Sequence, residues 1–265
     1  MTLSDLTKRL CEGGIREADV EARLLLSHFC GVSPAALLAE RTRDYESEAL
    51  GAAVARRLNR EPLAHILGEV GFFEETYFVS PDCLIPRADT ELLVEKAIAL
   101  LPHGARFADF CTGSGCIAVS VLAHRPDLSA LAVDLSDAAL ALAKRNAARN
   151  GVADRLDLLK DDILSPAHLK NNFDVILSNP PYIRTEVVPT LAPELAYEPK
   201  MALDGGEDGL LFYRALLRHF SPSLFLLEIG FDQGEDIARL GKEHGYAVTV
   251  ERDLGGNDRL AILKK

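Results

Sequence analysis

The chain is organised around the stretch Phe173-Asp174-Val175-Ile176-Leu177-Ser178-Asn179-Pro180-Pro181-Tyr182. Its first part, residues 173–178, predicts a short buried strand. The two prolines then remove two backbone N–H donors and fix φ, so the strand must end at the asparagine. In an open α/β sheet, ligands bind outside the carboxyl ends of the strands. We therefore expect residues 179–182, the Asn-Pro-Pro-Tyr motif, to form part of a binding site at such an end.

From residue 106 onward, predicted strands and helices alternate. The strands are expected at 106–111, 129–134, 155–160, 173–178, 224–229, 247–252 and 259–264, and the helices at 115–125, 136–150, 208–220 and 234–244. This alternation predicts a mostly parallel, doubly wound α/β sheet. The last two strands are joined only by residues 253–258, which is too short for a crossover, so they should form an antiparallel hairpin. A seven-stranded sheet with such an ending resembles the Rossmann-like fold of class I methyltransferases.

The region before this sheet has a different pattern. Residues 1–67 predict helices only, for example through the helical spacing of Leu3, Leu6 and Leu10, and are expected to form a small helical domain. Residues 68–88 alternate apolar and polar side chains, which predicts a hairpin linker. The methyltransferase domain should then cover 89–265. The helical domain is expected either to cap the larger domain or to dock a macromolecular substrate.

Two details of the join between these regions leave alternatives open. Asp89 or Thr90 is expected to cap the helix that follows, because both residue types favour that position. Arg87 precedes this cap in a rigid turn, where it is either a surface charge or a contact to an anionic ligand.

Composition narrows the class of protein. With 265 residues, 48% of them apolar and 26% charged, the chain resembles an ordinary globular protein. A net charge of −11 argues against broad binding of a phosphate backbone. The five cysteines are odd in number and lack a Cys-x-x-Cys pattern, which favours reduced thiols and no metal site. No apolar signal core or membrane-spanning run is present, so we expect a soluble cytoplasmic protein.

A glycine-rich loop follows the first strand of the expected sheet, in the sequence Asp109-Phe110-Cys111-Thr112-Gly113-Ser114-Gly115-Cys116. Glycines let backbone N–H groups approach a ligand closely at the start of a helix. Asp134 ends the next strand, where a carboxylate can accept hydrogen bonds from both ribose hydroxyls. The loop and the acid together predict a site for a nucleoside cofactor.

These features leave the identity of the nucleoside open. The pattern Gly113-x-Gly115-x-x-Ala118, with an acid about 20 residues later, also satisfies the dinucleotide fingerprint of dehydrogenases. A nicotinamide-dependent oxidoreductase is therefore one alternative. The pair Asp161 and Asp162 follows the third strand. One of these acids could accept a hydrogen bond from an adenine amino group. The alternative is that they are solvated charges of the loop.

The Asn-Pro-Pro-Tyr motif separates the alternatives, because hydride transfer has no use for it and methyl transfer to a planar nitrogen does. The Asn179 side-chain oxygen and the Pro180 carbonyl can accept hydrogen bonds from such a nitrogen and hold it for attack. Tyr182 offers a flat face for stacking. We expect Asn179 and Pro180 to be catalytic, and both of them to bind the substrate together with Pro181 and Tyr182. No general base is required before attack.

Over nearly its whole length the sequence resembles the release-factor glutamine methyltransferase family. The resemblance is carried by the helical amino-terminal region, the glycine loop and the motifs Ile85-Pro86-Arg87-x-x-Thr90-Glu91, Asn179-Pro180-Pro181-Tyr182-Ile183, Tyr197-Glu198-Pro199 and Gly255-x-Asn257-x-Arg259. It implies S-adenosyl-L-methionine as methyl donor. The implied acceptor is the glutamine of the Gly-Gly-Gln motif in class 1 peptide-chain release factors. This protein methylation gives N5-methylglutamine and supports translation termination.

Carried over by position, the resemblance implies which residues bind each molecule. The expected cofactor-binding residues are Cys111, Thr112, Gly113, Ser114, Gly115, Asp134, Asp162 and Asn179. Cys111 stands where the family often has glycine, which is tolerable if the contact is made by the backbone. Ile163 stands where an aromatic residue can flank the adenine, which weakens adenine packing. Residues 183–207 form a long segment that we expect to close as a lid over the glutamine.

Two further functions remain as alternatives. An adenine-N6 DNA methyltransferase shares the Asn-Pro-Pro-Tyr motif, but the charge of −11 and the lack of a basic target-reading domain disfavour it. A non-catalytic adaptor that binds S-adenosylmethionine would tolerate loss of Asn179, which this chain keeps. We expect release factors as protein partners, with no direct nucleic acid binding and no membrane association.

Overall fold

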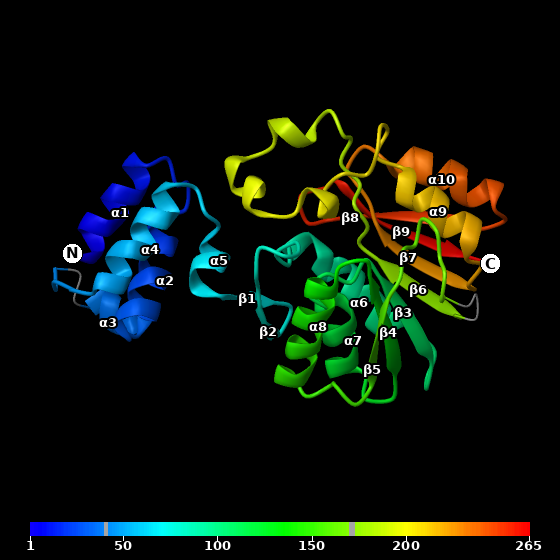
Figure 1. The fold of residues 1–265 in the computed structure, drawn as a ribbon, viewed down its shortest axis with the longest axis horizontal. Coiled ribbons are helices and arrows are strands. Elements are labelled where there is room, and N and C mark those ends of the chain that lie inside the picture. The colour runs from blue at the N-terminus through cyan, green and yellow to red at the C-terminus, as the bar shows by residue number, and fades with distance from the viewer. Residues whose placement is uncertain (40–41, 170–172) are drawn as a thin grey trace. The chain divides into compact units, whose positions relative to one another are not determined.

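The computed structural model describes residues 1–39, 42–169 and 173–265. These residues form two compact units. The helical unit contains Met1–Gly68 together with Ala192–Tyr197, and the sheet unit contains Glu69–Leu191 and Glu198–Lys265 (Figure 1). No helix in the described ranges has the length and apolar character needed to cross a membrane.

The helical unit is built from amphipathic helices whose apolar faces meet in one core. The helices are α1 (Leu3–Glu12), α2 (Ala18–Cys30), α3 (Pro34–Ala39), α4 (Glu48–Leu58) and α5 (Leu63–Leu67). The expected stripe of α1 is buried, since Leu6 and Leu10 are fully covered. Gly31 ends α2 in the left-handed conformation, with φ of 66°. The Ser33 hydroxyl accepts a hydrogen bond from the Ala36 N–H at the start of α3.

A segment distant in sequence, Ala192–Tyr197, also belongs to the helical unit. Arg57 of α4 is only 6% exposed and donates to Glu21 Oε2 over 2.6 Å and to Glu194 Oε1 over 3.2 Å. The Tyr197 hydroxyl donates to the Asn59 carbonyl over 2.8 Å. The buried guanidinium is paired with two carboxylates, as a buried charge requires. Part of the 183–207 stretch is therefore held by helical-unit side chains.

Gly51 offers a simple test of the helical unit. It lies in the exposed interior of α4, and nothing lies within 4 Å of where a Cβ would be. We expect Gly51→Ala to raise the free energy of unfolding by about 0.5–1 kcal/mol, because alanine loses less backbone entropy in a helix. Urea denaturation measures the change. A fall in stability would contradict the geometry of α4.

The sheet unit begins with the expected hairpin, formed by β1 (Glu69–Phe72) and β2 (Glu75–Phe78), which pair antiparallel. The main sheet has seven strands in the order β5-β4-β3-β6-β7-β9-β8. These strands are β3 (Arg106–Phe110), β4 (Ser129–Asp134), β5 (Leu156–Lys160), β6 (Val175–Ser178), β7 (Leu224–Glu228), β8 (Ala247–Arg252) and β9 (Asp258–Lys264). The β3–β7 strands run parallel, and β9 is antiparallel to both β7 and β8. The predicted mixed sheet and its terminal hairpin are confirmed.

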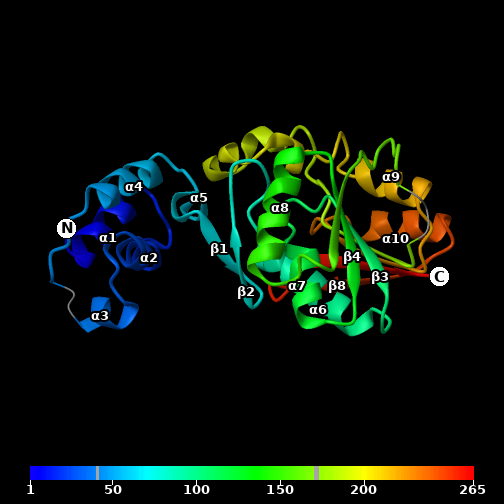
Figure 2. The same ribbon diagram turned by 60° about the horizontal axis from the view of Figure 1, so that its bottom comes forward.

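Helices cover both faces of the sheet (Figures 1 and 2). They are α6 (Glu91–Leu100), α7 (Cys116–His124), α8 (Asp137–Arg149), α9 (Leu211–His219) and α10 (Gly234–Glu243). Side chains of α6 and α7, such as Val94 and Val121, pack in one apolar core with Phe107 and Leu177. Side chains of α9 and α10 pack in a second core with Phe110 and other residues of the opposite sheet face. A sheet buried on both faces explains why its strands are nearly continuous apolar runs.

The expected cap of α6 is wrong. Residues Ala88–Thr90 form a short 3₁₀ turn, η1, and Thr90 has helical dihedrals and makes no side-chain capping bond. Its hydroxyl is instead the acceptor for the Asn179 amide, at 3.2 Å. A tertiary partner has thus taken the place of the local cap.

The order of the strands reverses direction between β3 and β6. From β3 the chain continues to β4 on one side, and from β6 it continues to β7 on the other. Phe110 and Ser178 are register partners at the ends of these two strands, and the Ser178 hydroxyl donates to the Phe110 carbonyl over 2.6 Å. The loops that follow β3 and β6 must therefore diverge and leave a crevice, which is where such sheets bind ligands.

Candidate active site

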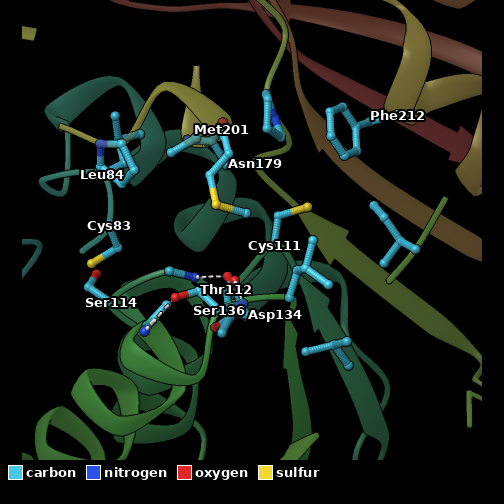
Figure 3. A pocket seen from close by; sticks show the side chains of 18 of the residues that line it. Cys83, Leu84, Cys111, Thr112, Ser114, Asp134, Ser136, Asn179, Met201 and Phe212 are labelled. Atoms are coloured by element: carbon cyan, nitrogen blue, oxygen red, sulfur yellow. Dashed lines mark hydrogen bonds between the residues drawn. The ribbon is translucent and has the colours of Figure 1, made fainter. Parts of the chain in front are cut away.

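A cavity of about 470 Å³ lies at this crevice, within the range of small-molecule sites. Its wall includes most of the residues predicted for the site, namely Cys111, Thr112, Gly113, Ser114, Asp134, Asp162, Asn179 and Pro181. Figure 3 shows Thr112 and Ser136 close to Asp134, with Asn179 and Met201 across the cavity. The structure thus brings the glycine loop, the acid after β4 and the Asn-Pro-Pro-Tyr motif to one cavity.

Gly115, Pro180 and Tyr182 are not part of the cavity wall. Gly115 has φ of 81° at the start of α7, and a Cβ there would lie 3.0 Å from the Ala143 Cβ. This glycine lets α7 approach α8 closely. Pro180 is buried, and Tyr182 is half-buried against the core beneath α9.

Cys111 adopts the left-handed conformation, with φ of 58°. Glycine adopts this conformation at no steric cost, which explains why glycine suits the position. A cysteine side chain there carries strain on the order of 1 kcal/mol. Burial, followed by the nearby carboxylates of Asp134 and Asp109, raises the pKa of the thiol well above its ordinary value. The thiol is therefore neutral and unreactive at physiological pH.

Asp134 organises the glycine loop. Its Oδ2 accepts from the Gly113 N–H and its Oδ1 from the Ser136 N–H, both at 2.9 Å. Burial raises the pKa of this carboxyl, and the two N–H groups oppose the rise. Each carboxylate oxygen has a second acceptor site. The residue can therefore hold the loop and still accept hydrogen bonds from a ligand in the cavity.

The two acids after β5 have different surroundings. Asp161 is buried, and its oxygens accept from the N–H groups of Ala167, His168 and Leu169 at 2.8–3.0 Å. It shapes its own loop. Asp162 accepts from the Leu164 N–H at 2.8 Å and is half-buried on the cavity wall beside Ile163. Both acids line the cavity, but the Asp161 oxygens are engaged by its own loop, so Asp162 is the one available to a ligand.

The side chains that hold the glycine loop from behind escaped sequence reasoning. Asp109 of β3 is fully buried, and its Oδ2 accepts from the Thr112 hydroxyl at 2.6 Å. Among the described residues, its Oδ1 has no hydrogen-bond partner. Asn146 of α8 is also fully buried and donates to the Ser114 carbonyl over 2.9 Å. A carboxylate inside an otherwise apolar strand was the available signal for Asp109, whereas Asn146 gave none.

Asp109 makes stability depend on pH. Burial raises its pKa to about 7, against the hydrogen bonds from Thr112 and Ala118. In the unfolded chain the carboxyl ionises near pH 4. Between these values the folded state binds more protons, so the contribution is complete below about pH 4 and is lost as pH rises through about 7. We expect the free energy of unfolding to fall by on the order of 2 kcal/mol between about pH 5.5 and 7.5 from this group.

Urea denaturation at those two pH values measures the fall. The matched control is Asp109→Asn, which has the same shape and no proton to lose. The fall should be smaller in this variant than in the wild type. An equal pH dependence in the two proteins would mean that Asp109 is ionised in the folded state.

The Asn-Pro-Pro-Tyr turn is held by polar contacts on several sides. Asn179 Nδ2 donates to Thr90 Oγ1 over 3.2 Å, which leaves its side-chain oxygen for another partner. The Tyr182 hydroxyl donates to Glu228 Oε1 over 3.3 Å. The Tyr182 carbonyl accepts from Gln233 Nε2 at 3.0 Å. Thr90, Glu228 and Gln233 are almost fully buried, and sequence reasoning assigned none of them to the site.

The segment after the motif is pinned to it at both ends. The Ile183 N–H donates to the Leu203 carbonyl over 3.0 Å, and the Gly205 N–H donates to the Ile183 carbonyl over 2.7 Å. Between these points the chain forms only short 3₁₀ turns, η2 (Val188–Thr190), η3 (Pro193–Tyr197) and η4 (Lys200–Ala202). Residues of the segment that line the cavity are Thr185, Pro199, Met201, Ala202, Asp204 and Gly206.

Two of the quoted motifs meet beside the cavity. The buried carboxylate of Glu198 accepts from the Ile85 N–H at 2.9 Å and forms an ion pair with Arg87. The ion pair excludes a free surface charge at Arg87, whereas the expected contact to an anionic ligand stays a prediction, since Arg87 also lines the cavity. The arginine links the turn before α6 to the segment that lines the cavity.

The residues present fit a nucleoside cofactor with a positively charged centre. Asp134 and Asp162 supply acceptors on the cavity wall, and apolar side chains such as Ile163 line the space between. This site at the switch point of a seven-stranded sheet, with its antiparallel last strand, defines a class I S-adenosylmethionine-dependent methyltransferase.

Comparisons with known proteins agree with this class and narrow it. The family model "Methyltransferase small domain" matches residues 88–242, and "PrmC N-terminal domain" matches residues 2–68. The release factor glutamine methyltransferase of Cereibacter sphaeroides is 44% identical over 95% of this chain and 93% of its own length. That of Caulobacter vibrioides is 38% identical over 96% of this chain and 92% of its own length.

The solved structure of the hMettl16 catalytic domain shares the fold, with a TM-score of 0.58 at 16% identity over 83% of this chain and 82% of that one. The identities and coverage of the two bacterial relatives decide the family. This chain belongs to the release factor glutamine methyltransferase family.

Proposed function

We propose that the protein transfers a methyl group from S-adenosylmethionine to the side-chain nitrogen, N5, of the glutamine in the Gly-Gly-Gln motif of class 1 peptide-chain release factors. The proposal places the protein in the cytoplasm, where it supports translation termination. The observation that carries it is the position of Asn179. Asn179 lines the cavity opposite the glycine loop, and its side-chain NH₂ group donates a hydrogen bond to the Thr90 hydroxyl.

The donor is proposed to lie between the glycine loop and the acids. Cys111–Gly115 would present backbone groups to it, Asp134 would accept from its ribose hydroxyls, and Asp162 from its adenine amino group. Isoleucine at position 163 supplies an apolar wall in place of an aromatic face. When bound, the donor supplies a methyl group made electrophilic by its positively charged sulfur.

The acceptor amide is proposed to bind at Asn179–Tyr182. The Asn179 side-chain oxygen and the Pro180 carbonyl would accept from the amide N–H groups, while Pro181 and Tyr182 bound its planar face. These acceptors would favour a pyramidal nitrogen and hold it ready to take the methyl group that the bound donor would supply, with the sulfur keeping the electron pair of the broken carbon–sulfur bond. The methylated nitrogen is then acidic and loses its proton to water, so no protein base is needed.

The other parts of the chain are proposed to serve the protein substrate. Residues 183–207 would act as a lid, which is supported by the six residues of this segment that line the cavity. Residues 1–67 would dock the release factor, residues 68–88 would link the two domains, and residues 89–265 would carry the reaction. The proposal includes no direct binding of nucleic acid.

One labelling experiment tests this function. The protein is incubated with a donor that carries a labelled methyl group and, separately, with a release factor, its Gly-Gly-Ala variant and duplex DNA. Label is expected on the parent factor only. Label on DNA would favour an adenine methyltransferase, and equal label on the Gly-Gly-Ala variant would exclude the proposed acceptor.

A second measurement tests the docking role. A short peptide that contains Gly-Gly-Gln is compared with the intact release factor as substrate. The intact factor should have the higher kcat/KM, because only it offers a surface to the helical domain. Equal kcat/KM values for the peptide and the intact factor would favour the alternative that residues 1–67 only cap the larger domain.

A further inference from the structure

Two buried side chains behind Asn179 have no role in the proposed chemistry. Thr90 and Glu228 are each 2% exposed. Thr90 lies in η1 before α6, and Glu228 ends β7, so the two come from parts of the chain far apart in sequence. Both lie next to the motif: Thr90 contacts the Asn179 amide and Glu228 contacts the Tyr182 hydroxyl.

The Asn179 carboxamide can in principle take two orientations of nearly equal shape. One presents its oxygen to the cavity and the other presents its NH₂ group. Only the first can accept a hydrogen bond from a substrate N–H, since an amide NH₂ is a donor only. Something must therefore select the orientation. The bond from Asn179 Nδ2 to Thr90 Oγ1 does so, provided that Thr90 acts as acceptor.

A hydroxyl has a single hydrogen, so its direction depends on the other neighbour. Here that neighbour is the Glu228 carboxylate. Burial raises the pKa of Glu228 to about 7, and a hydrogen bond from the Thr90 side chain is the largest of the interactions that oppose this rise. Above about pH 7, where Glu228 is ionised, its carboxylate only accepts hydrogen bonds. It draws the Thr90 hydrogen toward itself and leaves the lone pairs of Thr90 for the Asn179 NH₂ group.

Two neighbours favour the ionised form of Glu228 against the burial that raises its pKa. The Tyr182 hydroxyl donates to it, and the positive charge of Arg259 favours the ionised form. Arg259 of β9 is held by Asp253 and Asp89 at 3.2 and 3.3 Å. These contacts connect the Pro-Arg-x-x-Thr-Glu and Gly-x-Asn-x-Arg motifs. Neither motif was given a role in the chemistry proposed above.

We propose that Thr90 and Glu228 are positioning residues that fix the polarity of the Asn179 carboxamide, so that its oxygen faces the substrate nitrogen. The inference rests on the proposed function, in which Asn179 accepts from the acceptor amide. Glu228 sets the direction of the Thr90 hydroxyl, and Thr90 sets the direction of Asn179. Thr90 lines the cavity beside Asn179, and Glu228 is not part of the cavity wall.

The test uses three variants of the full-length protein, with turnover on a release factor and donor affinity by calorimetry. Thr90→Val keeps the shape and removes the hydroxyl. Thr90→Ser is the matched control that keeps the hydroxyl. Glu228→Gln keeps the shape but offers an NH₂ group, which donates to Thr90 and turns its hydrogen toward Asn179.

We expect Thr90→Val and Glu228→Gln to lower kcat about tenfold to a hundredfold, the range found when a supporting residue behind a functional group is lost. KM for the release factor and the dissociation constant of the donor should each change less than about threefold, because a tenfold change would need 1.4 kcal/mol of lost binding. Thr90→Ser should keep most of the wild-type kcat. Thermal unfolding confirms that each variant is folded.

Several outcomes would overturn the inference. One is a wild-type kcat in either Thr90→Val or folded Glu228→Gln. Another is a Thr90→Ser variant that is as impaired as Thr90→Val. A third is a loss of donor affinity that equals the loss of kcat. If Thr90→Val does not fold, Glu228→Gln and Thr90→Ser decide. Failure of the wild-type protein to label the release factor is a different result, since it refutes the proposed function before any variant is compared.

Discussion

Replacing Asn179 with alanine is expected to lower kcat for release-factor methylation by about 100- to 1,000-fold, the cost of removing one preorganised hydrogen-bonding group from an active site. The affinity for S-adenosylmethionine should change far less. The reason is that Asn179 lies across the cavity from the glycine loop and Asp134, and its amide N–H is already bonded to Thr90. Its free oxygen is therefore available to the acceptor.

Single-turnover kinetics and calorimetry with the donor separate the two effects. Asn150→Ala serves as the matched control: this asparagine follows α8 and donates to the Thr76 and Asn146 carbonyls, and it is not part of the cavity wall. Its turnover should stay close to that of the wild type. If Asn179→Ala lost donor affinity as strongly as turnover, Asn179 would be mainly a cofactor-binding residue.

Gly205→Ala should be the second most damaging single change. A Cβ at this position would lie 2.6 Å from the Tyr182 Cα and 2.8 Å from the Pro181 carbonyl oxygen. Both neighbours are backbone atoms of the Asn-Pro-Pro-Tyr turn, so the turn itself must move. A misplacement of about 1 Å can cost about 100-fold in rate. Overpacking of this kind also lowers the free energy of unfolding by about 1–3 kcal/mol.

Turnover and urea denaturation of Gly205→Ala measure both effects. Gly71→Ala in β1 is the matched control, because it adds the same methyl group outside the proposed docking domain, where nothing lies within 4 Å. We expect the control to keep wild-type turnover and to gain stability. Wild-type turnover in Gly205→Ala would show that the Asn-Pro-Pro-Tyr turn can shift without loss of activity. It would then be wrong that the segment packed against the turn sets the geometry of the turn in advance.

The sequence predicted the sheet well because the signals for it are local. Parallel strands buried on both faces must be short apolar runs, and β4 and β8 have the predicted bounds, 129–134 and 247–252. The short connection 253–258 excluded a crossover, and the last two strands are indeed antiparallel. The start of α8 depends on local conformation alone, because the Ser136 side chain accepts from the Ala139 N–H and caps the helix, and so does the glycine loop, where the residue type restricts the backbone directly.

The same local argument failed at Thr90. A threonine before a helix usually caps it, but here the hydroxyl is bonded to Asn179, which lies 89 positions further along the chain. Arg87 behaves likewise, since its partner Glu198 is 111 positions away. Asp161 and Asp162 both line the cavity, and which of them is free to meet a ligand depended on how the loop after β5 folds around Asp161.

By itself, the sequence determined the order of strands and helices, the ends of the strands that carry polar groups and the kinds of side chain found there. Each of these depends on the conformational preferences of a few consecutive residues. Only the tertiary structure decided which polar groups are paired: Thr90 with Asn179, Glu228 with Tyr182, Arg87 with Glu198, and Arg57 with Glu194. A buried polar group must find a partner, and the partner is whatever group the packed chain places within hydrogen-bond distance.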